Sequence, residues 1–368
     1  MSSSALDTSP DLTGNDSTAR EQADIKLLQD LVSIPSLSRQ ESEAVTFLRG
    51  AMAARGFQIQ PSPAGNAIGT IGSGAKHIIL LGHIDTVPGA IPVRIENGEL
   101  WGRGAVDAKG PLATFVAAAS AAASDLKARI TVVGAVGEEA IHSLGASEIA
   151  TWDAPDFCII GEPSSWDSLC LGYRGSLSLL YRAEASMRHT AGPGESIGET
   201  AITFWNALVS EADARNAGVK GSFDQIGLSL RAFNTHSDGL TEAADLSIGI
   251  RLPAGLDVPD LLGRIEQLAA AGNARITVEG LQEGYRTTKQ SKLVPPFLRA
   301  IREEGGSPTF KVKLGTSDMN VVGPVWKCPI AAYGPGDSSL DHTPDERIVL
   351  DEYLRAIRVL SRVLASFS

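Results

Sequence analysis

The stretch HIILLGHIDTVPG, residues 77–89, is the most informative part of this chain. Its run His77–Leu81 is too short for a good helix, and short apolar runs bounded by Gly, Asp or Pro are typical of strands buried on both faces. His83 and Asp85 follow where such a strand would end. In open α/β sheets, the carboxyl ends of the strands form the ligand crevice. The stretch therefore predicts a buried strand that carries a histidine and an aspartate to a functional site.

Similar runs recur on the carboxyl-terminal side of this stretch, at Ile130–Val136, Phe157–Ile160 and Ile330–Tyr333. Segments with helical character separate the runs, notably the Ala-rich Gly110–Ser124, which has a high helix propensity. On the amino-terminal side, Glu41–Arg55 has apolar residues at helical spacing. Strands that alternate with helices predict an α/β fold with a mostly parallel central sheet.

Residues 175–288 follow a different pattern. Their predicted strands alternate apolar and polar residues, as half-exposed antiparallel strands do, and the elements run in the order β-α-β-β-α-β. This order predicts a ferredoxin-like α+β unit. It is inserted into the α/β domain, which we expect to comprise residues 23–174 and 289–368. Residues 1–22 are rich in Ser, Thr, Asp and Gly and predict a disordered tail.

Composition narrows the class of protein. The chain has 368 residues, 43% hydrophobic and 20% charged, which is ordinary for a globular protein in water. Its formal net charge of −11 argues against nucleic acid as a partner, because phosphate binding needs a basic surface. No run reaches the roughly 18 apolar residues of a membrane span, and the N-terminus does not resemble a secretory signal. With three scattered cysteines that we expect to be reduced, we predict a cytoplasmic protein.

Histidine and acidic residues gather in five segments, most of them directly after predicted strands. In chain order they are His83 and Asp85, Asp107, Glu138 and Glu139, Glu162, and His342. Histidine nitrogens and carboxylate oxygens are good zinc ligands. A site for two metals needs about this many ligands, one of them bridging, and leaves a carboxylate free to act as a base. Each residue alone is more often a turn or cap residue, so the prediction depends on the whole set.

The pattern H-x-D, D, E-E, D or E, and a late H resembles the di-zinc aminoacylase and carboxypeptidase G2-like metallopeptidase family. The resemblance extends from about residue 25 to the end of the chain. It implies a di-zinc catalytic domain that hydrolyses an amide bond. It also implies that the unit at 175–288 is an inserted lid and dimerisation domain, so that the protein is a homodimer.

The resemblance also assigns the metal ligands. It implies that His83 and Glu162 bind one zinc, that Glu139 and His342 bind the second, and that Asp107 bridges the two. Each subunit would therefore hold two Zn²⁺ ions. The same ligand types also accept Co²⁺, which is a possible substitute.

Two further residues take catalytic roles by the same resemblance. Asp85 would orient the ring of His83, which fixes its tautomer. Glu138 would be the general base that takes a proton from the attacking water and passes it to the leaving amine. The family also has a cis peptide bond after the bridging aspartate, here Asp107–Ala108.

Substrate contacts follow from two lid segments and one loop. His189 in MRHTAGP resembles the lid histidine that reaches the partner's active site in dimeric members, and Arg251 in GIRLP resembles the lid arginine. Gly315, Thr316 and Ser317 in KLGTSDMNV resemble a loop that contacts the substrate near its carboxylate. The bland alternatives are a surface histidine and a solvated strand arginine. In place of the Asn-Val-x-Pro turn that many relatives have in the lid, this chain has the sequence NTHSDGLTEAADL.

The C-terminal segment CPIAAYGPGDSSLDHTPDER, residues 328–347, resembles the corresponding segment of one subgroup of the family. That subgroup releases lysine or ornithine from an N-acyl precursor in lysine biosynthesis by the α-aminoadipate route. The acyl group is often the terminal glutamate of an amino-group carrier protein. An acetylornithine or succinyl-diaminopimelate deacylase and a di-zinc dipeptidase or carboxypeptidase are the alternatives within the family. Two alternatives lie outside these enzymes: a catalytically silent metal-binding protein, against which Glu138 argues, and a structural or transport-associated binder, whose pocket would lack the metals.

Overall fold

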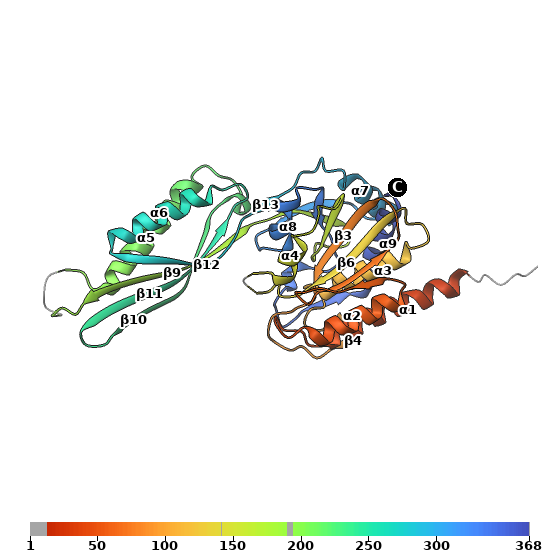
Figure 1. Ribbon diagram of the computed structural model, residues 1–368, viewed down its shortest axis with the longest axis horizontal. Helices are drawn as coiled ribbons and strands as arrows, with labels where there is room; N and C mark the ends of the chain where they lie inside the picture. Colours follow the sequence, from red (N-terminus) through yellow and green to blue (C-terminus); the bar gives the residue numbers. More distant parts are fainter. Residues whose placement is uncertain (1–12, 141, 190–193, 368) are drawn as a thin grey trace, which may run out of the picture.

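The computed structural model describes residues 13–140, 142–189 and 194–367, which form two lobes (Figure 1). The main lobe contains a nine-stranded sheet, and the small lobe contains a four-stranded sheet with two helices. Within the described residues, no helix is long and apolar enough to cross a membrane.

The main sheet has the strand order β1-β2-β6-β3-β7-β15-β8-β13, and β14 pairs with β8. Strand β3 is parallel to both β6 and β7, and β7 is parallel to β15, whereas the β1–β2, β2–β6 and β8–β15 pairs are antiparallel. The bounds are β1 Gln58–Gln60, β2 Ala67–Ile71, β3 Lys76–His83, β6 Ala128–Ala135, β7 Phe157–Gly161, β8 Ser168–Tyr173, β13 Tyr285–Arg286, β14 Thr309–Lys313 and β15 Ile330–Ala332. The predicted buried strands thus lie at the centre of a mixed, mostly parallel sheet.

Both faces of this sheet are covered by helices, which explains why its central strands are apolar throughout. Successive side chains of a strand point to opposite faces. In β3, Ile78 and Leu80 accordingly join one core cluster, whereas Ile79 and Leu81 join another. The first cluster packs under α1 Thr13–Ser33, α2 Ser42–Ala54, α3 Lys109–Ala121, α7 Val294–Glu303 and α9 Leu350–Ala365. The second packs under α4 Leu144–Ile149 and α8 Asp318–Trp326.

The small lobe has the element order β-α-β-β-α-β, as the sequence predicts, in a sheet of order β10-β11-β9-β12. Its elements are β9 Gly175–Ser186, α5 Ile197–Asn216, β10 Gly227–Ser237, β11 Thr241–Leu252, α6 Val258–Ala271 and β12 Ala274–Gln282. One sheet face packs on the helices through Leu177 and Ile250. The opposite face carries their polar neighbours Ser176, Ser178 and Arg251, because side chains alternate along each strand.

The sequence predicted the start of order less well. Helix α1 begins at Thr13, so the expectation of a disordered tail to residue 22 was wrong for residues 13–22. Extending a helix adds a backbone hydrogen bond for each residue, and Glu21 pairs with Arg358 of α9 at 2.9 Å, so the polar first turns continue the helix. Residues 1–12 lie outside the described residues. A three-stranded sheet of β4 Arg94–Glu96, β5 Glu99–Trp101 and β16 Arg347–Val349 was also not predicted.

Candidate active site

The predicted ligands lie at the carboxyl ends of three neighbouring strands. His83 ends β3, Glu139 follows β6, and Glu162 follows β7 directly. Asp107 precedes α3, and His342 lies in the loop before β16. Because β6, β3 and β7 are adjacent and parallel, their carboxyl ends meet at one edge of the sheet, which brings these side chains together.

Asp107 lies at the centre of the cluster. Its Oδ1 is 3.1 Å from His83 Nε2, and its Oδ2 is 3.1 Å from His342 Nε2. Glu162 Oε1 lies 3.8 Å from His83 Nε2, and Glu139 Oε1 lies 2.8 Å from His342 Nε2. Of the three groups among the described residues that could hold a metal ion, one consists of His83, Glu138 and Glu139, and the other two share Asp107. These other two contain the residues that the sequence assigned to the first and the second zinc.

Asp85 supports this cluster from behind and is fully buried. The ring of His83 donates from Nδ1 to the backbone carbonyl of Asp85 at 3.1 Å. The carboxylate of Asp85 accepts the backbone N–H groups of Glu138 and Glu139 at 3.1 and 3.0 Å, and the hydroxyl of Ser38 at 2.7 Å. Asp85 therefore holds the loop that carries both glutamates as well as the backbone that orients His83.

Glu138 is surrounded by the rest of the cluster. Its carboxylate lies within 4.8 Å of a nitrogen of His83 and an oxygen of Glu139, one residue from each of the two groups that share Asp107. Burial raises the pKa of Glu138 well above its ordinary value, and the charges of Asp318, Glu162 and Glu139 add to this effect, while His83 opposes it. A buried carboxyl group with a raised pKa can accept and return a proton near neutral pH, as a general base must.

The loop before α3 is fixed by Glu346, which the sequence analysis did not single out. Glu346 is fully buried, and one oxygen accepts the N–H groups of Val106 and Asp107 at 3.0 and 3.1 Å. Its other oxygen accepts from Arg103 at 2.6 Å. The Asp107–Ala108 peptide bond is cis, as the resemblance implied. Glu346 follows His342 by four residues, and that proximity in the sequence was the available signal.

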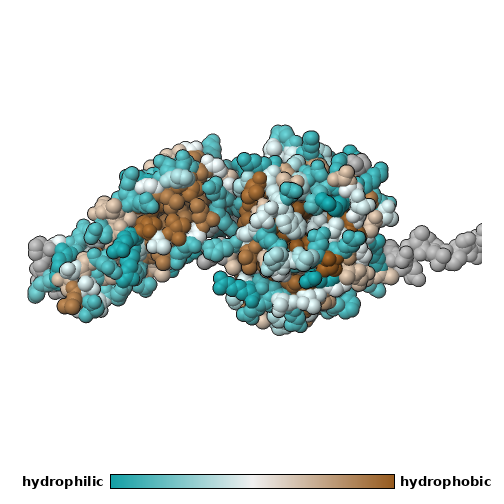
Figure 2. All heavy atoms as spheres, in the orientation of Figure 1, coloured by the Kyte–Doolittle hydropathy of each residue, from teal (hydrophilic) through white to brown (hydrophobic). Residues whose placement is uncertain are grey.

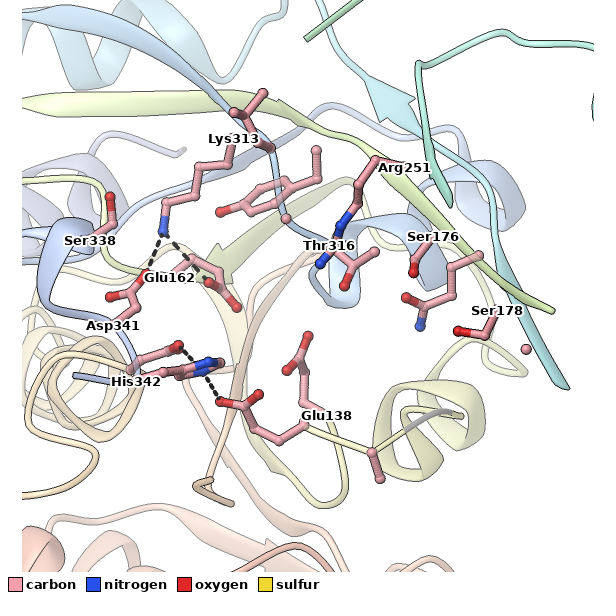
Figure 3. A pocket seen from close by; sticks show the side chains of 18 of the residues that line it. Glu138, Glu162, Ser176, Ser178, Arg251, Lys313, Thr316, Ser338, Asp341 and His342 are labelled. Atoms are coloured by element: carbon pink, nitrogen blue, oxygen red, sulfur yellow. Dashed lines mark hydrogen bonds and ion pairs between the residues drawn. The ribbon is translucent and has the colours of Figure 1, made fainter. Parts of the chain in front are cut away.

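Five of the residues named above line a cavity of about 480 Å³ between the two lobes (Figure 3), namely Asp107, Glu138, Glu139, Glu162 and His342. The sequence analysis missed Lys313 and Asp341, which both line it. Lys313 points between Asp341 and Glu162, with its Nζ 3.6 Å and 4.0 Å from their carboxylate oxygens. Burial lowers the pKa of Lys313, but Glu162, Asp341 and Asp107 outweigh it and raise the pKa overall, so the lysine is charged. Both residues adjoin predicted site residues, yet their types alone carried no signal.

Only some of the predicted substrate contacts lie at the cavity. Arg251, Gly315 and Thr316 line the cavity. Ser317 does not, because it is fully buried and its hydroxyl accepts the N–H of Met319 as the N-cap of α8. His189 lies past the end of β9. Ser178 of β9 lines the cavity, and the strand continues for eight residues to Ser186, so the end of β9 that precedes His189 lies roughly 26 Å along the strand from the cavity of its own chain.

The chemistry of the cavity fits metal cations. Five carboxylates line it: those of Asp107, Glu138, Glu139, Glu162 and Asp341. Among the described residues that line it, Lys313 is the single lysine or arginine from the main lobe. Burial, followed by the charge of Asp107, raises the pKa of Glu162 to about 8 and that of Asp341 to about 7. So many buried carboxylates repel one another, and cations between them would relieve that repulsion.

Comparisons with known proteins agree with this geometry. The profile of Peptidase family M20/M25/M40 matches residues 79–366. The LysW-lysine hydrolase of Deinococcus radiodurans is 47% identical over 356 residues, which cover 94% of this chain and 98% of that protein. The LysW-lysine/LysW-ornithine hydrolase of Saccharolobus islandicus is 30% identical over 329 residues, 89% of this chain and 91% of that one.

Solved structures share the fold. A tripeptidase from Staphylococcus aureus matches with a TM-score of 0.76 at 20% identity, over 94% of this chain and 98% of its own. A metallo-carboxypeptidase of the M20 family from Sulfolobus solfataricus matches with a TM-score of 0.74 at 18% identity, over 93% and 98%. At these identities the likeness concerns the fold alone.

Proposed function

The chain belongs to peptidase family M20/M25/M40, and on that premise we propose that it is a metal-dependent amide hydrolase that releases lysine, or ornithine, from an N-acyl precursor. The precursor is the form linked to an amino-group carrier protein, and the reaction belongs to lysine biosynthesis by the α-aminoadipate route. The relative from Deinococcus radiodurans supports this choice, because it is 47% identical over nearly its whole length and is named as a hydrolase of LysW-linked lysine.

The observation that carries the proposal is the position of Asp107 between two histidines. Each of its oxygens faces a different His Nε2 at 3.1 Å, so one carboxylate serves both candidate metal positions. We propose that His83 and Glu162 complete one position and that Glu139 and His342 complete the other. Two zinc ions suit this donor set, with Co²⁺ as a substitute. When bound, they polarise the amide carbonyl and lower the pKa of bound water.

The residues of the chain transfer the proton, position the catalytic loop and bind the substrate. Glu138 accepts a proton from the water that attacks the amide carbonyl carbon. As the C–N bond breaks, Glu138 passes that proton to the leaving nitrogen, so the acid and the free amine are the products. Asp85 is a positioning residue, because its hydrogen bonds fix the backbone of Glu138 and Glu139. Arg251, Gly315 and Thr316 hold the substrate near its carboxylate.

We propose that the protein acts as a homodimer in which His189 enters the partner's cavity. The distance along β9 supports this, because His189 cannot serve the cavity of its own chain in this arrangement. A patch of apolar residues on the small lobe, in the region of α5 and α6, offers a surface for association (Figure 2). Ile202 of α5 is 47% exposed. A cytoplasmic location stays a prediction.

A parallel substrate assay tests the function. The zinc-loaded protein is offered carrier-linked lysine, Nα-acetyl-ornithine and a glutamate dipeptide, and freed amino acids are followed by mass spectrometry with a chelated control. We expect lysine to be released chiefly from the carrier and release to stop on chelation. Preference for the acetylated substrate would move the protein to the deacylases, and preference for the dipeptide to the dipeptidases. Release from none of the three would contradict the proposal.

A further inference from the structure

The wall of the cavity opposite the carboxylates carries a second arginine, Arg231, which the sequence analysis did not consider. Arg231 lies in β10 at an irregularity of the sheet. Leu230 pairs with Ile248 and Ala232 pairs with Ser247, so Arg231 is an extra residue without a partner on β11. Bulges of this kind bend a strand and re-aim a side chain, and they are common beside active sites. The bulge therefore sets the direction of this guanidinium.

The guanidinium of Arg231 packs against residues of the neighbouring strands β11 and β9. A Cβ added to Gly249 of β11 would lie 2.5 Å from its Nη2, so only a glycine leaves room for it there. Its Nη1 donates to the hydroxyl of Ser178 at 3.3 Å. Ser178 pairs with Gly249 across the sheet, so both lie on the same face. The position of Arg231 thus depends on the bulge in β10, on the absence of a side chain at Gly249 and on the hydroxyl of Ser178.

Arg231 and Arg251 are two positive charges of the cavity wall. Among the described residues, no ion pair includes either of them. Burial lowers the pKa of Arg251, and the charge of Arg231 lowers it further, which shows that the two are close. Arg174, buried behind them, donates to the carbonyl of Arg251 at 3.1 Å and adds a third positive charge. Unpaired like charges in a cavity favour the binding of anions.

Two arginines can bind two carboxylates, and the proposed substrate carries two carboxylates. The lysine carries one carboxylate on the amine side of the scissile amide. A C-terminal glutamate as the acyl group carries another on the acyl side, because an amide made through either of its carboxyl groups leaves the other free. An acetyl group has none. Next to the scissile amide, the acyl groups of the proposed carrier-linked substrate and of its acetylated analogue therefore differ by one negative charge.

We propose that Arg231 forms a second carboxylate subsite, beside Arg251, that recognises the free carboxylate of a glutamate-terminated acyl group. The inference rests on the proposed function, because it concerns the substrate of the same cavity. The subsite gives the protein its preference for carrier-linked lysine over acetyl-lysine. Arg251 remains the contact for the carboxylate on the amine side.

Binding of two matched probes tests the subsite. One probe is Nα-glutaryl-lysine, whose acyl chain ends in a carboxylate as glutamate does, and the other is its neutral carboxamide analogue. Affinities are measured by calorimetry on the metal-loaded protein with Glu138→Gln, so that neither probe is hydrolysed. In this background, Arg231→Gln should weaken binding of the glutaryl probe by about tenfold or more, since a charged hydrogen bond is lost. Binding of the carboxamide should not change.

Two further variants sharpen the result. Gly249→Ala keeps the charge but displaces the guanidinium, and it should cause the same selective loss. Arg275→Gln removes an exposed arginine of the same sheet outside the cavity, and both affinities should stay unchanged. Equal losses for both probes with Arg231→Gln, no loss for either, or no binding of the glutaryl probe by the parent would each overturn the proposal. Because binding is measured without turnover, failure of the proposed hydrolysis would be seen separately in the substrate assay.

Discussion

Glu138 combines two properties that a proton carrier needs, since it lies beside His83 and Glu139, one residue from each proposed metal position, and burial raises its pKa. Glutamine has nearly the same size and cannot accept the proton. We expect Glu138→Gln to lower kcat by roughly 10²- to 10⁴-fold while the protein still binds two metal ions per subunit. Rate measurements with metal analysis on the same sample check this. A variant that lost its metal would show that Glu138 is a ligand instead.

His77 offers a test of the fold's electrostatics away from the active site. Its ring accepts or donates at Thr131 Oγ1 at 2.9 Å, and burial, with the charge of Arg129, lowers its pKa from 6.5 to about 4. The fold therefore favours neutral His77, and this stabilisation is complete above pH 6.5 and lost as the pH falls toward 4.

The comparison is between the wild type and His77→Gln, both metal-free. The free energy of unfolding of the wild type should fall more steeply than that of the variant between pH 6.5 and pH 4. Urea unfolding at a series of pH values gives both curves. Parallel curves through this range would show that His77 is as easily protonated in the folded state as in the unfolded one.

Among single residues, those that follow a strand or belong to a motif could be predicted from the sequence. Residues whose role depends on contacts with distant parts of the chain could not. His83, Asp107 and Glu162 could be found because strand ends and a motif mark them. Arg231 could not, because a bulge is a shift in pairing between two strands and leaves no trace in the alternation of one strand. Glu346 was missed because its role depends on the backbone of a loop some 240 residues away in the chain.

Among the elements, helix α8 shows how a motif residue can be structural. Ser317 and Asn320 form a reciprocal cap, since the serine hydroxyl accepts the N–H of Met319 and the Asn320 side chain accepts the N–H of Ser317. We expect Ser317→Ala to lower the free energy of unfolding by about 1–2 kcal/mol and to leave KM unchanged. Denaturant unfolding and steady-state kinetics check the two parts. A raised KM with unchanged stability would indicate the substrate contact that the sequence suggested.

Strands and helices were predictable where burial imposes a pattern. In α2, the residues at helical spacing are the buried ones, Ala44, Val45, Leu48 and Met52. Strand β4 of the small three-stranded sheet has three residues, all exposed, so no burial pattern existed to be recognised. Its stability comes from pairing with β5, which a single stretch of sequence does not reveal.

At the scale of the whole molecule, the main lobe contributes the carboxylates of the cavity, and the small lobe contributes its two arginines. The sequence indicated both lobes, because the pattern of apolar residues changes where β9 begins. It could not show the partnership between subunits that we propose for His189, since no single chain contains it.

Mixed dimers test that partnership. Glu138→Gln and His189→Ala should each be nearly inactive, but dimers with one subunit of each kind should recover activity. In them, the subunit with Glu138 intact receives His189 from its neighbour. Co-expression with two affinity tags isolates the mixed dimer for assay. Mixed dimers as inactive as their parents would show that His189 does not act across the interface.

The central claim is that Asp107 joins two metal positions, and anomalous diffraction at the zinc absorption edge tests it most directly. Crystals of the zinc-loaded protein should give two anomalous peaks per subunit, one on each side of the Asp107 carboxylate. One peak should contact His83 and Glu162, and the other Glu139 and His342. A single peak, no peak, or a peak that contacts Glu138 instead of Asp107 would contradict the account.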